Sequence, residues 1–209
     1  METLLQRRAK CITLLSLAFL LAAAACGRPA KLAPLARDAV VLAFGDSLTY
    51  GTGAAEEESY PAQLERLIGR KVVRAGVPGE VTAQALARLP AALDEHSPQL
   101  LVLCIGGNDF LRRLGNAQAA QNVRAMVKLA RSRGVAVLLV GTPEPALLPA
   151  PPAFYGEIAR EFGVPYEAGV IAEVLKDQSL KSDPIHPNAR GYRVIAERIA
   201  ARLKKGGAL

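Results

Sequence analysis

The chain has 209 residues, of which 51% are hydrophobic and 22% charged, and this composition excludes an intrinsically disordered protein. The length allows one substantial core but not two ordinary domains. The formal net charge is +7, yet aromatic residues make up only 5% of the chain and tryptophan is absent. Because base stacking needs aromatic side chains, no nucleic-acid partner is expected.

Residues 1–26 have the pattern of an export signal. Three positively charged residues at positions 7–10 precede an uncharged stretch over 11–25, which is short for a membrane-spanning helix. An uncleaved anchor helix is the alternative. Residues 23–27 read Ala-Ala-Ala-Cys-Gly and are similar to a bacterial lipobox, in which Cys26 would be lipidated; cleavage nearby without a lipid is the rival. We expect an exported protein of the periplasm or cell envelope, anchored to a membrane if Cys26 carries a lipid.

Beyond a linker predicted over 27–38, apolar runs alternate with amphipathic segments. Strands are predicted at five short apolar runs, over 40–44, 71–75, 100–105, 135–140 and 164–166. Helices are predicted between and after them, over 59–68, 81–93, 117–131, 151–162 and 187–204. Strands that are apolar on both faces and separated by helices indicate a parallel sheet with helices on each side. The predicted fold class is α/β: one three-layer α/β/α sandwich over 39–206, flavodoxin-like, with a mainly parallel five-stranded sheet.

Three turns that follow predicted strands hold residues suited to acyl transfer. Ser47 follows the first strand in Gly-Asp-Ser-Leu, Gly79 the second in Gly-Val-Pro-Gly, and Asn108 the third in Gly-Gly-Asn-Asp. Taken singly, each is an ordinary turn. Parallel sheets bind ligands at the carboxyl ends of their strands, however. There a glycine lets the backbone approach a ligand, and an Asn amide can donate to an oxyanion.

A fourth turn, over 183–188, holds His186, one of two histidines in the chain. Histidine is the commonest base near neutral pH, and it needs a partner that fixes its tautomer. Asp183 lies three residues earlier, so a tight turn would bring its carboxylate to Nδ1 and leave Nε2 for Ser47. The other histidine, His96, lies at a predicted helix end, where a cap or surface position is expected. Ser47, His186 and Asp183 therefore form a candidate catalytic triad.

The four turns together resemble the sequence blocks of the GDSL, or SGNH, hydrolase family. Residues 45–48 match the GDSL block, Gly79 the glycine block, residues 106–109 the GGND block, and Asp183 with His186 the final block, all in family order. The resemblance implies that Ser47 is the nucleophile, that His186 is general base and then general acid, and that Asp183 orients His186. It also implies an oxyanion hole formed by the N–H groups of Ser47 and Gly79 and the side chain of Asn108.

Two positions depart from the family pattern. Arg74 stands where the family often has Asn, in Asn-Ala-Gly, and Pro184 replaces the glycine of the usual Asp-Gly-x-His. Proline fixes φ near −65°, so the contact between Asp183 and His186 requires a turn that accepts this value. The neighbouring carboxylates Asp46 and Asp109 are expected to brace their loops.

The predicted function is an exported serine esterase that hydrolyses acyl or aryl carboxylic esters. The resemblance is nearest to the small bacterial thioesterase, lysophospholipase and arylesterase group, so the expected partner is a small-molecule or lipid ester. The alternatives are a carbohydrate O-deacetylase and a catalytically silent envelope lipoprotein that binds a ligand. Acyl transfer of this kind requires no cofactor, and one candidate histidine gives no metal-ligand spacing.

Two apolar segments add further expectations. The loop over 146–150 is expected either to line an acyl-chain groove or simply to pack against the domain. Cys104 lies inside an apolar run and is expected to be a buried core residue without a disulfide.

Overall fold

The computed structural model of the protein describes residues 30–146 and 148–209; the predicted export signal and Cys26 lie outside the described residues. The described chain forms a five-stranded sheet in the order β2-β1-β3-β4-β5, and every neighbouring pair is parallel. The strands are β1 Val40–Gly45, β2 Lys71–Gly76, β3 Leu100–Cys104, β4 Ala136–Val140 and β5 Tyr166–Glu167. The predicted α/β fold with a parallel sheet is confirmed.

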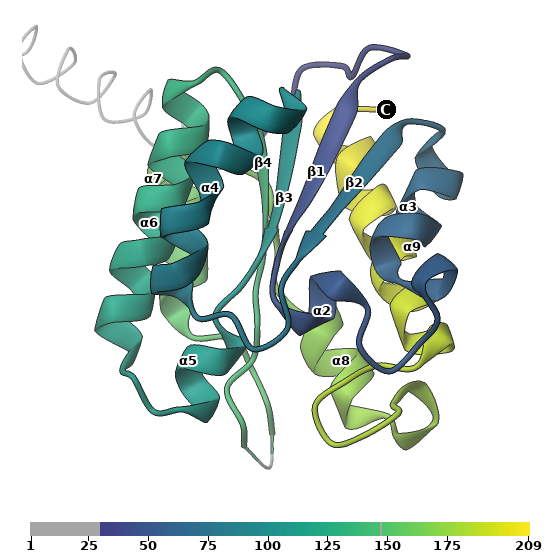
Figure 1. Cartoon of the computed structure of the whole chain (residues 1–209), viewed down its shortest axis with the longest axis vertical. Coiled ribbons are helices and arrows are strands. Elements are labelled where there is room, and N and C mark those ends of the chain that lie inside the picture. The colour runs from purple at the N-terminus through teal and green to yellow at the C-terminus, as the bar shows by residue number, and fades with distance from the viewer. Residues whose placement is uncertain (1–29, 147) are drawn as a thin grey trace, which may run out of the picture. The chain divides into compact units, whose positions relative to one another are not determined.

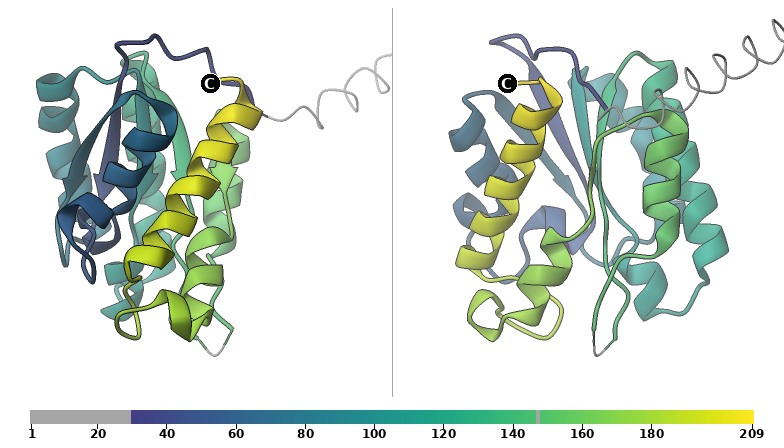
Figure 2. Two further views of the ribbon diagram at one scale, coloured as in Figure 1. Left: turned by 90° about the vertical axis from the view of Figure 1, so that its right-hand side faces the viewer. Right: turned by 180° about the vertical axis from the view of Figure 1, so that it is seen from behind.

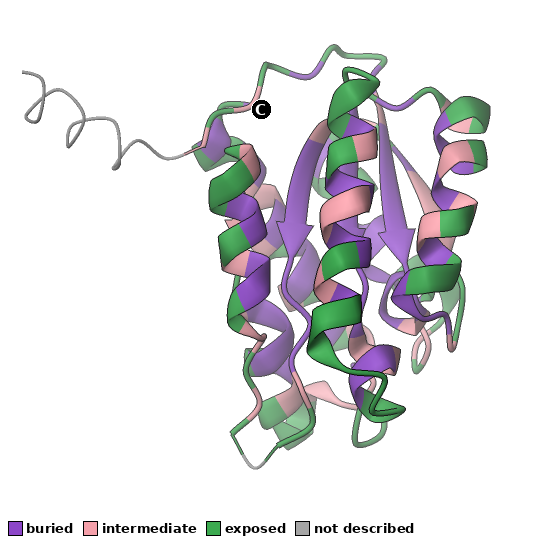
Figure 3. Ribbon diagram, turned by 90° about the vertical axis from the view of Figure 1, so that its left-hand side faces the viewer, coloured by how far each residue is buried: buried purple, intermediate pink, exposed green. Residues whose placement is uncertain are grey.

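Helices cover both faces of this sheet, so the described domain has three layers (Figure 1). The helices are α2 Ser47–Tyr50, α3 Tyr60–Ile68, α4 Thr82–His96, α5 Gly107–Leu111, α6 Asn116–Ser132, α7 Ala153–Phe162, α8 Val170–Lys176 and α9 Ala189–Gly206, with short 3₁₀ turns at Glu56–Glu58 and Gln178–Leu180. Helices α4, α6 and α7 lie on one face, and α3, α8 and α9 lie on the other. Figure 3 shows buried strands behind helices whose outer sides are exposed.

Alternating side chains of the strands divide the core into two clusters. In β1, Val41 and Ala43 pack with α3 and α9, whereas Leu42 and Phe44 pack with α4 and α6. Successive strand residues point to opposite faces, so a strand buried on both faces is a continuous apolar run. Cys104, at the end of β3, is buried with a free thiol, as predicted.

The predicted helices and strands are confirmed, with small shifts at their ends. Helix α9 begins at Ala189 because the Asn188 side chain caps it, accepting from the N–H groups of Arg190 and Gly191. Strand β5 has only two residues and pairs with the end of β4. Helices α2, α5 and α8 were not predicted, since segments of four to seven residues show little helical periodicity.

The segment predicted as a linker is fastened to the domain from Leu32 onward. The Leu32 N–H donates to the Gly206 carbonyl at 2.8 Å, and the Leu35 N–H donates to the Ala208 carbonyl at 2.9 Å. Leu35 is buried against the core. The segment therefore crosses the end of the domain at which the C-terminus lies (Figure 2). Among the helices described, none has both the length and the apolar character to cross a membrane.

Candidate active site

Ser47 stands just past the carboxyl end of the interior strand β1, as the first residue of α2. The preceding Asp46 is the N-cap of this helix, and its Oδ1 accepts from the Leu48 N–H at 3.0 Å. A Cβ on Gly45 would overlap the Cys104 carbonyl oxygen, so only glycine permits this approach of β1 to β3. The short helix α2, which begins with this serine, lies at the carboxyl end of β1 (Figure 1).

The structure brings Ser47, His186 and Asp183 into one chain of hydrogen bonds. The Ser47 Oγ lies 3.0 Å from His186 Nε2, and His186 Nδ1 lies 2.7 Å from Asp183 Oδ2. An ionised carboxylate only accepts hydrogen bonds, so Nδ1 carries the proton. The neutral ring then accepts from the serine hydroxyl through Nε2. This is the tautomer in which the imidazole can take a proton from Ser47.

Pro184 fits the turn between Asp183 and His186. The Asp183 Oδ1 accepts from the backbone N–H groups of Ile185 and His186, each at 2.8 Å. The turn does not use an N–H at position 184, so proline removes no hydrogen bond here. Burial of Asp183 acts to raise its pKa, but the hydrogen bonds from the His186 ring and from the two N–H groups outweigh it. The net pKa of Asp183 lies below its usual value, so the carboxylate is ionised near neutral pH.

The histidine loop is also tied to the turn that follows α2. The Tyr192 hydroxyl donates to the Thr52 carbonyl at 2.7 Å and so joins the two segments. Within the histidine loop, the Ser182 N–H donates to the His186 carbonyl at 3.0 Å. A Cβ on Gly53, whose φ is +99°, would overlap Ser182 Oγ. The contacts of Tyr192 with Thr52 and of Ser182 with Gly53 hold the serine and histidine loops together. Ser47 and His186 therefore lie within hydrogen-bond distance although 139 residues separate them in sequence.

Three groups near Ser47 have the chemistry of oxyanion donors. The Ser47 N–H starts a helix and has no intrahelical acceptor. Gly79, with φ +79°, lies in a turn closed by the Glu80 N–H donating to the Val77 carbonyl at 3.1 Å. The Asn108 Nδ2 donates to the Glu80 carbonyl at 3.0 Å. An Asn amide has two N–H bonds, so one remains for a ligand.

Asp46 and Asp109 brace their loops through hydrogen bonds, as expected from the sequence, and both are buried. Asp109 accepts from the Thr82 N–H at 2.8 Å and from the Thr82 hydroxyl at 2.6 Å, which joins α5 to the start of α4. Asp46 is 2% exposed. Burial, assisted by the Glu80 and Asp109 carboxylates and opposed by the Leu48 N–H, raises the pKa of Asp46 to about 7.

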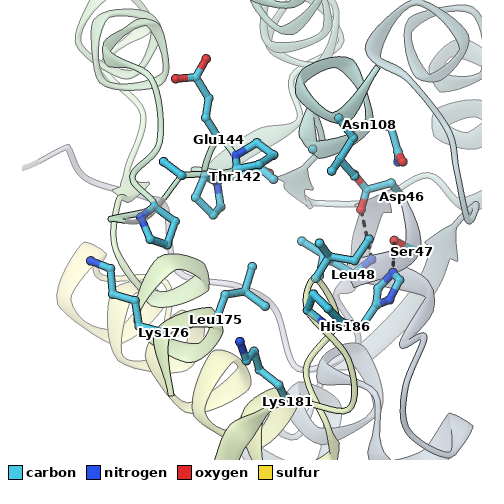
Figure 4. Close-up of a pocket in the computed structure, with 18 of the residues that line it drawn as sticks. Asp46, Ser47, Leu48, Asn108, Thr142, Glu144, Leu175, Lys176, Lys181 and His186 are labelled. Atoms are coloured by element: carbon cyan, nitrogen blue, oxygen red, sulfur yellow. Dashed lines mark hydrogen bonds between the residues drawn. The ribbon is translucent and has the colours of Figure 1, made fainter. Parts of the chain in front are cut away.

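A cavity of about 460 Å³ opens onto Ser47 and His186 (Figure 4). Its walls are mainly apolar, formed by Leu48, Leu111, Pro143, Pro145, Ala146, Pro149, Leu175, Pro184 and Ile185. Asn108 borders the cavity, whereas Gly79 lies in an adjacent depression with Val77 and Arg112. The structure therefore brings Ser47, Asn108 and His186 into one pocket and places Gly79 beside it.

The loop over 146–150 contributes some of its residues to the cavity. Ala146 and Pro149 line the cavity, but Leu148 is 77% exposed and is not among its lining residues. Sequence reasoning missed Thr142 and Glu144, although their position directly after β4 was a usable signal. It also missed Lys176 and Lys181, which reach the cavity from the wall that holds Leu175, across from Glu144 (Figure 4).

In residues 30–146 and 148–209, no three His, Cys, Asp or Glu side chains are grouped so as to hold a metal ion. The site is instead a serine, a histidine and a carboxylate at the carboxyl edge of a parallel sheet. This fold and this arrangement define the class of α/β serine hydrolases.

The family follows from comparison with known proteins. Residues 43–194 match the model of the GDSL-like Lipase/Acylhydrolase family, and the chain belongs to this family. It is 34% identical to the thioesterase 1/protease 1/lysophospholipase L1 of Escherichia coli (strain K12), over 78% of this chain and 83% of that protein. It is 32% identical to the esterase TesA of Pseudomonas aeruginosa, over 78% and 87% of the two chains.

Solved structures agree with this assignment. The chain is similar to a crystal structure of TesA, with a TM-score of 0.71 and 30% identity over 79% of this chain and 98% of that one. It is also similar to AlinE4, an SGNH-hydrolase family esterase, with a TM-score of 0.62 and 30% identity over 82% and 97% of the two chains. The protein is thus a serine hydrolase that acts on ester bonds.

Proposed function

We propose that the protein is an exported esterase that hydrolyses acyl or aryl carboxylic esters, including those of the lysophospholipid or thioester type. Ser47 is the nucleophile, His186 the general base and acid, and Asp183 the residue that orients His186. The observation that carries this proposal is the unbroken chain of hydrogen bonds from Ser47 Oγ through His186 to Asp183, at 3.0 and 2.7 Å. Ser47, at the start of this series of hydrogen bonds, faces an apolar cavity that can hold the acyl or aryl group.

Acylation begins when Ser47 Oγ attacks the ester carbonyl carbon. His186 Nε2 accepts the hydroxyl proton, and the imidazolium that forms is stabilised by the ionised Asp183. The carbonyl oxygen becomes an oxyanion, for which we assign the Ser47 N–H, the Gly79 N–H and the second N–H of the Asn108 amide as donors. Losing one such donor costs about 2.7 to 4 kcal/mol of transition-state stabilisation in other serine hydrolases.

The tetrahedral intermediate then collapses. His186 returns its proton to the leaving alcohol or thiol, and the acyl group remains on Ser47 as an ester. Water enters on the side of His186, gives up a proton to Nε2, and attacks the acyl-enzyme through the same oxyanion geometry. The second tetrahedral intermediate collapses by breaking the bond between the acyl carbon and Ser47 Oγ, and His186 returns its proton to that oxygen. The carboxylic acid leaves and the free enzyme is restored, so the cycle consumes only water and the ester.

The lining of the cavity favours an acyl or aryl ester over a sugar ester. Proline, leucine, isoleucine and alanine side chains form most of its walls. Among the residues that the structure describes, the lining includes no Phe, Tyr or Trp ring on which a sugar could stack. The relatives named above carry the names thioesterase, lysophospholipase and esterase, which accords with this choice. The complete hydrogen-bonded Ser47, His186 and Asp183 speak against a silent binding protein.

Export is the other part of the proposal. It rests on the charged start and the apolar stretch of residues 1–26, with Cys26 as the lipidation site. The chain enters the domain at Leu32, which is bonded to the far end of α9. Helix α9 begins three residues after His186 and has 18 residues, so this end lies about 27 Å along the helix axis from its start. A lipid on Cys26 would therefore fasten the domain by the end remote from the cavity.

Mass spectrometry of the mature N-terminus tests the lipid anchor. An unmodified Cys26, or a mature chain that starts elsewhere, would refute it.

Ester hydrolysis is tested with p-nitrophenyl esters from acetate to palmitate on the signal-free protein. Ser47→Ala is expected to lower kcat by about 10⁴-fold or more on every ester. Ser132→Ala is the matched control, because Ser132 lies at the end of α6 and its hydroxyl donates to the Leu129 carbonyl at 2.8 Å, within its own helix. An optimum beyond acetate supports the lipolytic assignment, and an optimum at acetate supports the deacetylase. Equal rates for wild type and Ser47→Ala would refute the assignment of the nucleophile.

A further inference from the structure

We propose that Arg88 is a positioning residue for the oxyanion hole. Arg88 lies on α4 and is not among the residues that line the cavity. Its guanidinium holds Glu80, and the Glu80 backbone in turn fixes the turn of Gly79 and the amide of Asn108. The inference rests on the proposed function, in which Gly79 and Asn108 donate to the oxyanion, and it identifies what holds these donors in place.

The contact between Arg88 and Glu80 is a bidentate ion pair in a largely buried setting. Arg88 Nε donates to Glu80 Oε1 at 2.9 Å, and Arg88 Nη2 donates to Glu80 Oε2 at 2.7 Å. The Glu80 side chain is 5% exposed and that of Arg88 is 30% exposed. The guanidinium also lies 4.0 Å from the centre of the Phe44 ring. The planar guanidinium of Arg88 fits between the Phe44 ring and the Glu80 carboxylate and donates to both carboxylate oxygens. A lysine ammonium cannot make this bidentate contact in the same geometry.

The same guanidinium contacts the backbone at the ends of two strands. Arg88 Nη2 donates to the Ala75 carbonyl at 3.2 Å in β2 and to the Gly45 carbonyl at 3.5 Å in β1. The Gly45 carbonyl also accepts from the Val77 N–H at 3.0 Å. One side chain therefore links the end of β1, two residues before Ser47, with the end of β2, from which the Gly79 turn departs.

Glu80 passes this constraint to the other two donors. Its N–H closes the turn in which Gly79 adopts a φ of +79°, and its carbonyl accepts from Asn108 Nδ2 at 3.0 Å. A shift of the Glu80 backbone therefore moves the Gly79 N–H and turns the Asn108 amide together. An oxyanion donor must lie within about 2.7 to 3.1 Å of the developing charge, so small shifts weaken it. The effect falls on kcat, because these donors act on the transition state more than on the bound ester.

The experiment compares Arg88→Lys, Arg88→Gln and Glu80→Gln with wild type on p-nitrophenyl butyrate. We expect kcat to fall about 10-fold for Arg88→Lys and about 100-fold for Arg88→Gln, with KM within about twofold of wild type. For comparison, removal of one entire oxyanion-hole donor lowers kcat about 10²- to 10³-fold. Arg124→Lys is the matched control, since Arg124 pairs with Glu161 at 2.8 Å on the outer helices α6 and α7, and its kcat should stay within twofold. Binding of an alkyl boronic acid, which forms a tetrahedral adduct with the serine, should weaken in step with kcat.

A double-mutant cycle separates positioning from a general loss of structure. If Arg88 acts through Asn108 and Gly79, then the fold-loss of kcat caused by Arg88→Gln should be smaller in an Asn108→Ala background than in wild type. We expect the two fold-losses to differ by at least a factor of about three. Equal losses in the two backgrounds, or a kcat for Arg88→Lys no lower than for Arg124→Lys, would overturn the proposal. Thermal melts show whether each variant is folded. If Arg88→Gln does not fold, the comparison is made with Arg88→Lys and Glu80→Gln instead. Ser47→Ala in the same series keeps the two proposals apart. If Ser47→Ala is active, the nucleophile assignment fails. If Ser47→Ala is inactive while the Arg88 variants keep the kcat of wild type, only the role of Arg88 is refuted.

Discussion

Asp46 makes the stability of the protein depend on pH in a way that one substitution should remove. The residue is 2% exposed, and burial, with smaller contributions from the Glu80 and Asp109 carboxylates, raises the pKa of its carboxyl group to about 7. An unfolded chain has an Asp pKa of about 3.9. The folded state therefore favours the neutral acid, and the stability that this group contributes is fully present below about pH 4. It is lost as the pH rises through about 7.

The size of the effect follows from the two pKa values. Between pH 5 and pH 8, the unfolded chain stays almost fully ionised while the folded carboxyl group gives up its proton. Linkage then predicts that wild type loses about 2 to 3 kcal/mol of unfolding free energy through this group alone. Asp46→Asn has no titrating group, and its Oδ1 can still accept from the Leu48 N–H, so the helix cap of α2 is kept.

Urea unfolding of wild type and Asp46→Asn at pH 5 and at pH 8 measures this contribution. Every other titrating group is shared by the two proteins, so the difference between their pH dependences isolates Asp46. We expect the stability of Asp46→Asn relative to wild type to rise by about 2 to 3 kcal/mol from pH 5 to pH 8. Parallel pH profiles for the two proteins would refute the reasoning, because they would show that Asp46 ionises alike in the folded and unfolded states.

Two further predictions concern the cavity and the triad. Asp183→Asn should lower kcat by about 10⁴-fold, because an amide favours the wrong imidazole tautomer. Asp177→Asn is the control, because the Asp177 carboxylate caps a short 3₁₀ turn. Equal kcat values for the two variants in steady-state kinetics would contradict the prediction. The double variant Lys176→Gln, Lys181→Gln should lower kcat/KM about threefold to tenfold on the anionic mono-p-nitrophenyl glutarate, but not on neutral p-nitrophenyl butyrate, since two cations are removed from the cavity wall. An equal effect on both esters would exclude a charge interaction.

Much of the fold could be predicted from sequence because the strands are buried on both faces. The runs at Val40–Gly45 and Leu100–Cys104 are continuously apolar, and the long helices show clear three- and four-residue periodicity. The short helices α2, α5 and α8 could not be predicted, because they exist through caps and through packing against distant loops. Asp46 caps α2, for example, and Glu167 accepts from the N–H groups that begin α8.

The candidate site divides in the same way. Sequence alone was enough to propose which residues carry the chemistry, because a nucleophile, a base and its partner are recognisable as residue types that follow strands at set places. The three-dimensional structure was needed to show that Pro184 leaves the Asp183 turn intact, that Gly79 stands beside the cavity, and that Leu148 is exposed and outside its lining. It alone revealed the contact of Arg88 with Glu80 and the raised pKa of Asp46. Burial and long-range hydrogen bonds depend on segments far apart in the chain, so no local pattern of residues encodes them.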